Sequence, residues 1–442
     1  MLAPVPLQVV PDRTLPSSAD VVVVGGGVVG AFTALELAEK GMSVALIEKG
    51  EIAHEQSGRN LGWVRMTGRA PAEIALMAAA LRKWEALNDR TGRETGYVRC
   101  GIAYADKSAQ EAHSRRSWST QPGADAFQPM EISDLRSLFP GCNFPSAGGL
   151  YGPHDGRAEP QLVAPAVAEA ARARGAKIFT NCAVRGFEVT DGGISKAITS
   201  KGAINTRAVV VAGGIWSTLL LRRFGVSFPQ LEVMATVMCT QPLDGPDVSF
   251  GTGDFAFRRR LDGGYNVGSF KTRVQIGPDT IRYGLKYLKA AGTQKIQYVP
   301  SRRFFADLLR GASWELQKPG PFETKRPEVL PWFDQQHVLR QVAGYFPFLS
   351  RARVSRSWVG LLDVTPDTLP VIDAIEDLPG LFLASGFSGH GFGLAPAAGQ
   401  LIAEMVVGEA LTVDPVPFAF SRFFPSKRGN GPGPRFNEKQ NN

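Results

Sequence analysis

The sequence is poor in cysteine. Four cysteines occur in 442 residues, at Cys100, Cys142, Cys182 and Cys239, and no two of them form a Cys-x-x-Cys pair. This scattered placement argues against a disulfide framework and against a zinc site, and it indicates free thiols in a reducing compartment.

Segments that would direct a chain into a membrane are also missing from the sequence. The first twenty residues show no charged stretch followed by an apolar core, so we expect no signal peptide. No uninterrupted apolar run reaches the length of a transmembrane helix. We therefore expect a cytoplasmic protein with no integral membrane segment.

Charge of one sign does not gather in any block. The 49 basic and 41 acidic residues give a net charge of +8. We interpret this excess as a solvated surface and expect no nucleic-acid partner; an acidic substrate or a loose membrane contact remains the alternative. The length and the hydrophobic fraction of 44% allow two domains with a large core, and a homo-oligomer is left open.

The clearest motif lies between residues 20 and 50. A valine-rich run ends in Gly25-Gly-Gly27-Val-Val-Gly30, an apolar helical pattern follows, and a second apolar run ends at Glu48. Gly25 permits a tight turn, Gly27 lets the backbone approach a pyrophosphate, and Gly30 lets the helix pack on the strand. Glu48 can accept hydrogen bonds from ribose hydroxyls. The pattern predicts dinucleotide binding.

Two later stretches repeat the order of strand, glycine turn and helix. One runs through Gly213 to Trp216, and the other runs from Leu381 through Gly389 to Pro396. Between them the sequence alternates as an antiparallel sheet would, including a hairpin over residues 255–268. In that hairpin the run Arg258–Arg260 is either a solvated edge or partly a substrate contact.

These patterns predict an α/β protein with a second, α+β domain. We expect residues 20–95, 151–229 and 355–412 to form a discontinuous Rossmann cofactor domain. Residues 96–150 and 230–354 would form a substrate domain with a mixed or antiparallel sheet. Residues 1–19 would be an N-terminal arm and residues 425–442 a disordered tail. A site at the domain interface is expected.

Several motifs together resemble the D-amino acid oxidase, glycine oxidase and sarcosine oxidase superfamily. They are the opening GGGVVG, the acid Glu48, SGRN at residues 57–60, VAGGIW at 211–216, GLLDVTPD at 360–367 and GFSGHGFGLAP at 386–396. The resemblance implies FAD and a glutathione-reductase-like FAD domain. It also implies oxidation of a C–N bond by hydride transfer to flavin N5, giving an imine that water hydrolyses. A flavin-dependent 2-hydroxy-acid dehydrogenase on the same fold is the alternative.

The resemblance also assigns cofactor contacts by motif. It places the following residues along FAD, from the pyrophosphate and adenosine to the flavin: Gly25, Gly27, Val28, Val29, Gly30, Glu48, Lys49, Gln56, Ser57, Arg59, Asn60, Leu61, Gly62, Trp63, Val184, Gly213, Trp216, Gly389, His390, Gly391, Phe392, Gly393 and Leu394. His390 would be a turn residue held through its backbone, in preference to a catalytic base.

Departures from the superfamily pattern concern the substrate. Many members carry Arg in Gly-Leu-Arg-Pro to grip the substrate carboxylate, and here Leu362 and Asp363 stand there. Either the carboxylate binds elsewhere, with Arg65 as the candidate, or the substrate is an amine whose cation meets Asp363.

Two further departures concern the flavin. Covalent members have Cys where this chain has Gly360, so FAD should be non-covalent. Some sarcosine oxidases place Lys over the flavin to activate oxygen, and the matching residue here is Asn266. The electron acceptor is therefore either oxygen or a quinone or protein. No acid–base set is conspicuous, which is typical of chemistry done by a cofactor.

Overall fold

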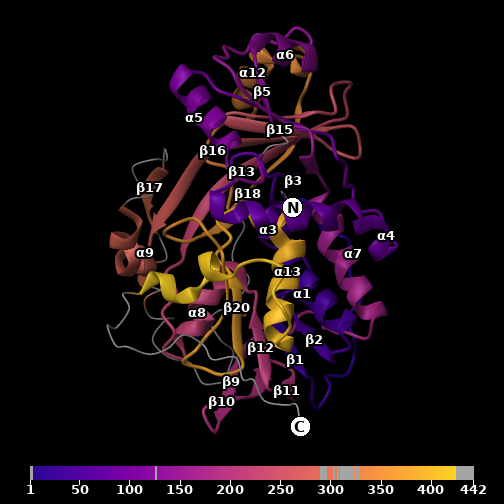
Figure 1. Ribbon diagram of the computed structural model, residues 1–442, viewed down its shortest axis with the longest axis vertical. Coiled ribbons are helices and arrows are strands. Elements are labelled where there is room, and N and C mark those ends of the chain that lie inside the picture. Colours follow the sequence, from indigo (N-terminus) through magenta and orange to yellow (C-terminus); the bar gives the residue numbers. More distant parts are fainter. Residues whose placement is uncertain are drawn as a thin grey trace.

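The computed structural model describes residues 3–124, 127–288, 296–301, 304–305, 308, 323 and 329–424. These residues form two main sheets. In Figure 1 the larger, mostly antiparallel sheet lies above the smaller, mostly parallel sheet. This arrangement confirms the predicted α/β class with a second domain. The predicted disordered tail, residues 425–442, lies outside the described residues.

The smaller sheet has the strand order β19-β20-β12-β1-β2-β8. Its strands are β1 (Val21–Val24), β2 (Val44–Ile47), β8 (Lys177–Phe179), β12 (Ala208–Val211), β20 (Leu381–Ser385) and the antiparallel edge strand β19 (Val371–Ala374). The central strands are nearly continuous valine runs because both faces of the sheet are covered. The strands of the three predicted strand–glycine–helix segments, β1, β12 and β20, are neighbours, so their glycine turns share one edge.

Helices cover one face of this sheet and a small sheet covers the other. The helices are α1 (Val28–Glu39), α3 (Pro71–Glu85), α7 (Pro160–Ala173) and α13 (Gly391–Val407), with α4 (Leu87–Thr91) beside them. The opposite face carries β9 (Val184–Thr190), β10 (Gly193–Thr199), β11 (Gly202–Asn205) and α8 (Ser217–Arg222). Two hydrophobic cores therefore enclose the valine strands.

The larger sheet has the order β18-β13-β16-β15-β14-β4-β6-β5, with β17 beside β16. The strands are β4 (Ile102–Ala105), β5 (Gln128–Met130), β6 (Gly149–Gly152), β13 (Leu231–Thr240), β14 (Ser249–Gly251), β15 (Phe255–Arg259), β16 (Tyr265–Ile276), β17 (Ile296–Pro300) and β18 (Val354–Val364). The segments that connect these strands contain the helices α5 (Ala109–Ser119), α6 (Ile132–Leu138), α9 (Pro278–Tyr283) and α12 (Gln335–Tyr345). Phenylalanines that include Phe250, Phe257 and Phe346 form its core.

One strand crosses a predicted domain boundary. We expected residues 355–412 to belong to the cofactor domain, but β18 pairs with β13 in the larger sheet. β18 nevertheless ends at the smaller sheet, because the carboxylate of Asp363 bonds to the backbone that follows β20. β18 therefore links the two domains directly.

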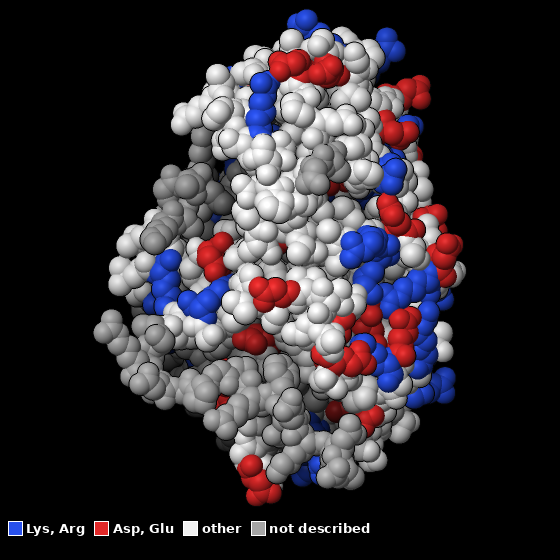
Figure 2. Space-filling view, viewed as in Figure 1, with Lys and Arg blue, Asp and Glu red and all other residues white. Residues whose placement is uncertain are grey.

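Charges of both signs lie side by side on the face shown in Figure 2. Around α4 and α7, Arg90 bonds to Glu36 and Glu39, and Arg174 bonds to Glu39. The positive excess of the sequence therefore does not form a single patch on this face. Among the described residues, no helix is both long enough and apolar enough to cross a membrane.

Candidate active site

A cleft opens where β1, β12 and β20 end. It is lined by residues 24–25, 27–29, 47–49, 51, 53–57, 60, 183–184, 212–217, 220, 361, 363, 384, 387, 389 and 391–392. Three parts of the chain that are far apart in sequence thus share one cavity. A ligand that touches all of them must be long, as a dinucleotide is.

The first glycine turn is shaped for close approach of the backbone. Gly25 has φ +108°, and a Cβ there would lie 2.5 Å from the carbonyl oxygen of Ala212. A Cβ on Gly30 would lie 1.9 Å from the carbonyl oxygen of Gly25. Beside the turn, the hydroxyl of Ser57 accepts a hydrogen bond from the Val28 N–H at 2.8 Å. The turn and the N-terminus of α1 have the geometry that pyrophosphate binding requires.

Glu48 lies at the adjacent end of β2. Its two carboxylate oxygens accept hydrogen bonds from the N–H groups of Gly26 and Gly50, each at 2.7 Å. Burial nevertheless raises the pKa of Glu48 above its usual value. Across the cleft, Lys49 Nζ lies 3.5 Å from the centroid of the Trp216 ring. The acid predicted to bind ribose is therefore held in a fixed orientation at the cleft wall.

The segment after β2 continues along the cleft through α2 (Gln56–Arg59) to β3 (Trp63–Val64). Asn60 turns the chain by donating to the Ser57 carbonyl at 2.7 Å and accepting from the Gly62 N–H at 2.8 Å. The Trp358 indole donates to the Arg59 carbonyl at 2.8 Å. These contacts fix residues 56–63, which we call the flavin loop, between the cleft and the larger sheet.

Polar atoms left without a partner mark the space beside the flavin loop. Among the described residues, Gln56 Oε1, Trp63 Nε1 and Asn266 Oδ1 are buried and make no hydrogen bond. A buried polar atom without a partner is costly, so such atoms are expected where a ligand supplies the missing bond. A flavin ring carries both donors and acceptors on its rim. These residues therefore fit FAD, and Gly360 offers no thiol for a covalent link.

The third glycine turn is held by Asp363. Its carboxylate accepts hydrogen bonds from the Gly386 N–H at 2.8 Å and the Phe387 N–H at 3.4 Å. Burial raises the pKa of Asp363 to about 6 despite these bonds. The adjacent Leu362 packs on Gly389, where a Cβ would lie 3.5 Å from Leu362 Cδ2. Asp363 therefore orients the turn that leads into α13, and Leu362 covers it.

Two arginines lie close together where the flavin loop leads into α3. Arg69 is 3% exposed, its Nε donates to the Arg65 carbonyl at 3.1 Å, and its Nη1 has no hydrogen-bond partner. Burial and the charge of Arg65 lower the pKa of Arg69 to about 9. The Arg65 guanidinium lies 5.8 Å from the Trp63 ring centroid and 5.7 Å from the Tyr104 ring centroid. Together they form a positively charged site with an aromatic wall.

His390 contacts the same site from the start of α13. Burial and the charge of Arg69 lower the pKa of His390 to about 4. Burial favours the neutral form of Glu73, but the hydrogen bond with His390 and the charge of Arg69 hold the Glu73 pKa below its usual value. A neutral imidazole beside an ionised carboxylate donates its Nδ1–H, so Nε2 is left as an acceptor. His390 is thus bonded through its side chain, and not only through its backbone.

The cleft gathers many of the predicted cofactor residues but not all of them. Gly30 and Leu394 are packed behind their turns, while Arg59, Leu61, Gly62, Trp63, His390 and Gly393 lie beyond the lining. Arg65, Asn266 and Leu362 also lie outside the lining, and Asp363 lies in it. Sequence reasoning missed Arg69 and Glu73, which contact Arg65 and His390. It also missed Glu159, whose carboxylate bonds to Arg258 of the arginine run at residues 258–260.

Comparison with known proteins defines the class. The profile of the family described as DAO, FAD dependent oxidoreductase, matches residues 20–405. The chain therefore belongs to this family of FAD-dependent oxidoreductases, and FAD is its cofactor.

Similar proteins include several that act on amino acids. Glycine oxidase of Pseudomonas putida is 25% identical over 416 residues, which cover 91% of this chain and 98% of that protein. The mitochondrial sarcosine dehydrogenase of Homo sapiens is 26% identical over 413 residues, but the chain spans only 40% of that protein's length. The L-amino acid deaminase from Proteus myxofaciens is 30% identical with a TM-score of 0.88, covering 95% of this chain and 97% of that one. None of these three is a 2-hydroxy-acid dehydrogenase, so they do not support the alternative.

Proposed function

We propose that the protein oxidises the C–N bond of an amino acid or an N-substituted amino acid. FAD supplies the chemistry by accepting the hydride from the substrate carbon. The substrate nitrogen loses a proton, the resulting imine takes up water, and a carbonyl compound and an amine or ammonia are released. The family membership and the names of the similar proteins support this reaction class.

The observation that carries the proposal is the unpartnered Nη1 of Arg69 beside Arg65. A buried guanidinium nitrogen needs an acceptor, and a carboxylate supplies one with full charge. The other reading, a substrate amine that meets Asp363, is less favoured because that carboxylate already accepts bonds from Gly386 and Phe387. We therefore assign the substrate carboxylate to Arg65 and Arg69.

His390 and Glu73 complete this proposed substrate site. The neutral imidazole places an acceptor, and no extra positive charge, near the two arginines. The amine must lose its proton before it can release hydride, and the positive charge of Arg65 and Arg69 favours the neutral amine. The protein's own part is therefore to hold the carboxylate and to keep the amine uncharged.

Anaerobic reduction of the flavin tests the proposal. The purified, FAD-loaded protein is mixed with glycine, N-methylglycine, L- and D-amino acids, simple amines and 2-hydroxy acids, and bleaching of the flavin absorption is followed. We expect bleaching by at least one amino acid and none by the hydroxy acids. Bleaching by simple amines alone would contradict the carboxylate assignment, and bleaching by hydroxy acids alone would contradict the reaction class.

We further propose that the protein works in the cytoplasm and binds FAD without a covalent bond. All four cysteines are free and three of them are buried, which supports a reducing compartment. Release of the flavin by acid precipitation tests the non-covalent link. Light scattering of the loaded protein tests whether it forms a homo-oligomer. The electron acceptor is either oxygen or a quinone or protein, and peroxide release compared with dye reduction distinguishes the two.

A further inference from the structure

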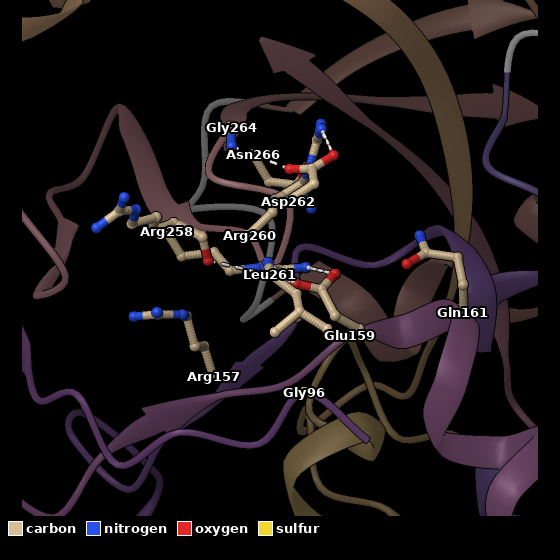
Figure 3. Close-up of polar contacts among 12 residues, drawn as sticks. Gly96, Arg157, Glu159, Gln161, Arg258, Arg260, Leu261, Asp262, Gly264 and Asn266 are labelled. Atoms are coloured by element: carbon tan, nitrogen blue, oxygen red, sulfur yellow. Dashed lines mark hydrogen bonds and ion pairs between the residues drawn. The ribbon is translucent and has the colours of Figure 1, made fainter. Parts of the chain in front are cut away.

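A buried ion pair between Arg258 and Glu159, shown in Figure 3, joins the two domains and contacts the flavin loop. Arg258 of β15 is fully buried, and its two terminal nitrogens bond to Glu159 at 2.6 and 3.0 Å. Burial alone would raise the pKa of Glu159, but the charge and hydrogen bonds of Arg258 hold it below its usual value. The Leu261 N–H also donates to Glu159, at 2.8 Å. Both groups are therefore charged, and each charge is compensated by the other.

The pair acts directly on the flavin loop. Arg258 Nε donates to the Leu61 carbonyl at 2.6 Å, and a Cβ on Gly62 would lie 2.6 Å from Arg258 Nη2. Asn266 is the cross-strand neighbour of Arg258, and its amide nitrogen donates to the same Leu61 carbonyl at 3.3 Å. The unpartnered Asn266 Oδ1 then remains for the cofactor. The guanidinium thus lies directly behind the backbone that we expect to touch the flavin.

The other charged side chains of the hairpin are paired as well. Arg260 bonds to Asp262, and Arg259 lies 3.3 Å from Asp247. Among the described charges of this hairpin, Arg258 is the fully buried one. Its carboxylate partner therefore decides whether the flavin loop is exposed to an uncompensated positive charge.

We propose that Glu159 neutralises Arg258 and thereby slows electron transfer from reduced FAD to molecular oxygen. This inference rests on the proposed function, since it concerns the second half of the same reaction. Oxygen takes two electrons and two protons from the reduced flavin and leaves as hydrogen peroxide, and the first electron creates a superoxide anion. An uncompensated cation nearby stabilises that anion, whereas a neutral pair does not. Arg258 and Glu159 are then positioning residues that also set acceptor preference.

The test uses the FAD-loaded full chain with flavin reduced by light, so no substrate is needed. Stopped-flow mixing with oxygen gives the reoxidation rate, and a redox titration gives the midpoint potential. Glu159→Gln leaves Arg258 uncompensated, and we expect reoxidation about tenfold faster, the order expected for one charge in an interior of effective dielectric about 20. Its potential should rise. The double variant Glu159→Gln/Arg258→Gln is neutral again and should match the wild-type rate within about threefold.

Benzoquinone provides a second acceptor that takes the same two electrons and two protons. We expect its reaction to change less than that of oxygen. Glu36→Gln is the matched control, because Glu36 is also buried and paired with Arg90, but it lies near the C-terminal end of α1, whose N-terminal end lines the cleft. It should lower stability and leave the oxygen rate unchanged.

If the pair had a purely structural role, the single and double variants would change the rate of reoxidation by oxygen in the same direction, and that result would overturn the proposal. Equal oxygen rates for wild type and Glu159→Gln would overturn it as well. If Glu159→Gln does not fold, Arg258→Gln leaves the carboxylate without its cation; an oxygen reaction slower than that of wild type supports the proposal, and an equal or faster one refutes it. If the protein binds FAD but no amino acid reduces the flavin, that result contradicts the proposed function and leaves this inference about oxygen unaffected.

Discussion

Nδ1 of His390 lies 2.9 Å from Oε1 of Glu73, which joins the first turn of α13 to the first turn of α3. The histidine is held neutral by burial and by Arg69, with a pKa of about 4. An unfolded chain would protonate the same imidazole near pH 6.5. Folding and proton binding are therefore opposed at this residue.

The first prediction is a loss of stability in acid that depends on His390. The unfolded chain binds the extra proton first, so the free energy of unfolding should fall as pH drops from about 6.5 to about 4. His390→Gln should remove about 1–3 kcal/mol of that pH dependence. Urea unfolding at a fixed FAD concentration, compared at pH 7 and pH 4.5, measures it. If the free energy of unfolding changed equally between pH 7 and pH 4.5 in wild type and in His390→Gln, the neutral state assigned to His390 would be contradicted.

Asp363 should show the opposite pH dependence. Its pKa is about 6 in the folded protein and lower in the unfolded chain, so the stability that it contributes is present below pH 3.8 and lost as pH rises through 6. Asp363→Asn keeps an acceptor for the turn without the charge, and it should gain stability relative to wild type above pH 6. Asp363→Ala leaves the Gly386 N–H unpaired and should cost about 1–3 kcal/mol at every pH. If the difference in the free energy of unfolding between wild type and Asp363→Asn did not vary with pH, the raised pKa of Asp363 would be refuted.

Gly62 should not tolerate a side chain. Gly62 and Gly41 both have positive φ, at +91° and +79°, but a Cβ meets the Arg258 guanidinium only at Gly62. Gly41→Ala should therefore cost only the backbone strain, about 1–2 kcal/mol, while Gly62→Ala should cost roughly 3 kcal/mol or more and weaken FAD binding. Thermal unfolding and flavin content report both effects. A Cβ on Gly62 would also lie 2.5 Å from the Ala158 carbonyl oxygen, so similar losses in the two variants would show that both Ala158 and Arg258 move away from the methyl group.

Arg65 and Arg69 should govern the binding of carboxylates. Acetate and other simple carboxylates that enter the site should perturb the flavin absorption, and the perturbation gives a dissociation constant without turnover. Arg69→Gln should weaken that binding roughly 10- to 100-fold, as loss of a charged hydrogen bond does. Arg99→Gln is the control, because Arg99 is exposed and pairs with Glu85 at the surface. Unchanged binding in Arg69→Gln would move the carboxylate to another site.

The cofactor half of the site was predictable because its signals are local. Gly25, Gly27 and Gly30 stand at fixed spacing between an apolar strand and a helix. The same order of strand, glycine turn and helix recurs before Trp216 and at Gly389. Parallel strands with such turns bring their ends to one edge. The pattern alone therefore placed three distant segments around one cleft.

The substrate half was less predictable because its contacts are long-range. Glu159 and Arg258 are 99 positions apart, and Glu73 and His390 are 317 positions apart. Neither member of either pair belongs to a recognisable spacing. The sequence offered Asp363 as the partner of a substrate amine, one of two alternatives. Its bonds to Gly386 and Phe387 could not be predicted, because they form only when β18 meets the turn after β20. That meeting is also why the boundary expected at residue 355 misses the course of β18.

The order in which the cleft is assembled has a consequence for biosynthesis. Its lining begins at Val24 and is completed only by Gly391 and Phe392. The ribosome makes the chain from the N-terminus, so the first turn is made long before Gly391 and Phe392, which complete the lining. FAD therefore has no finished pocket to enter on the nascent chain. Loading of the cofactor becomes a late event, and flavin supply should limit the yield of mature protein without limiting its synthesis.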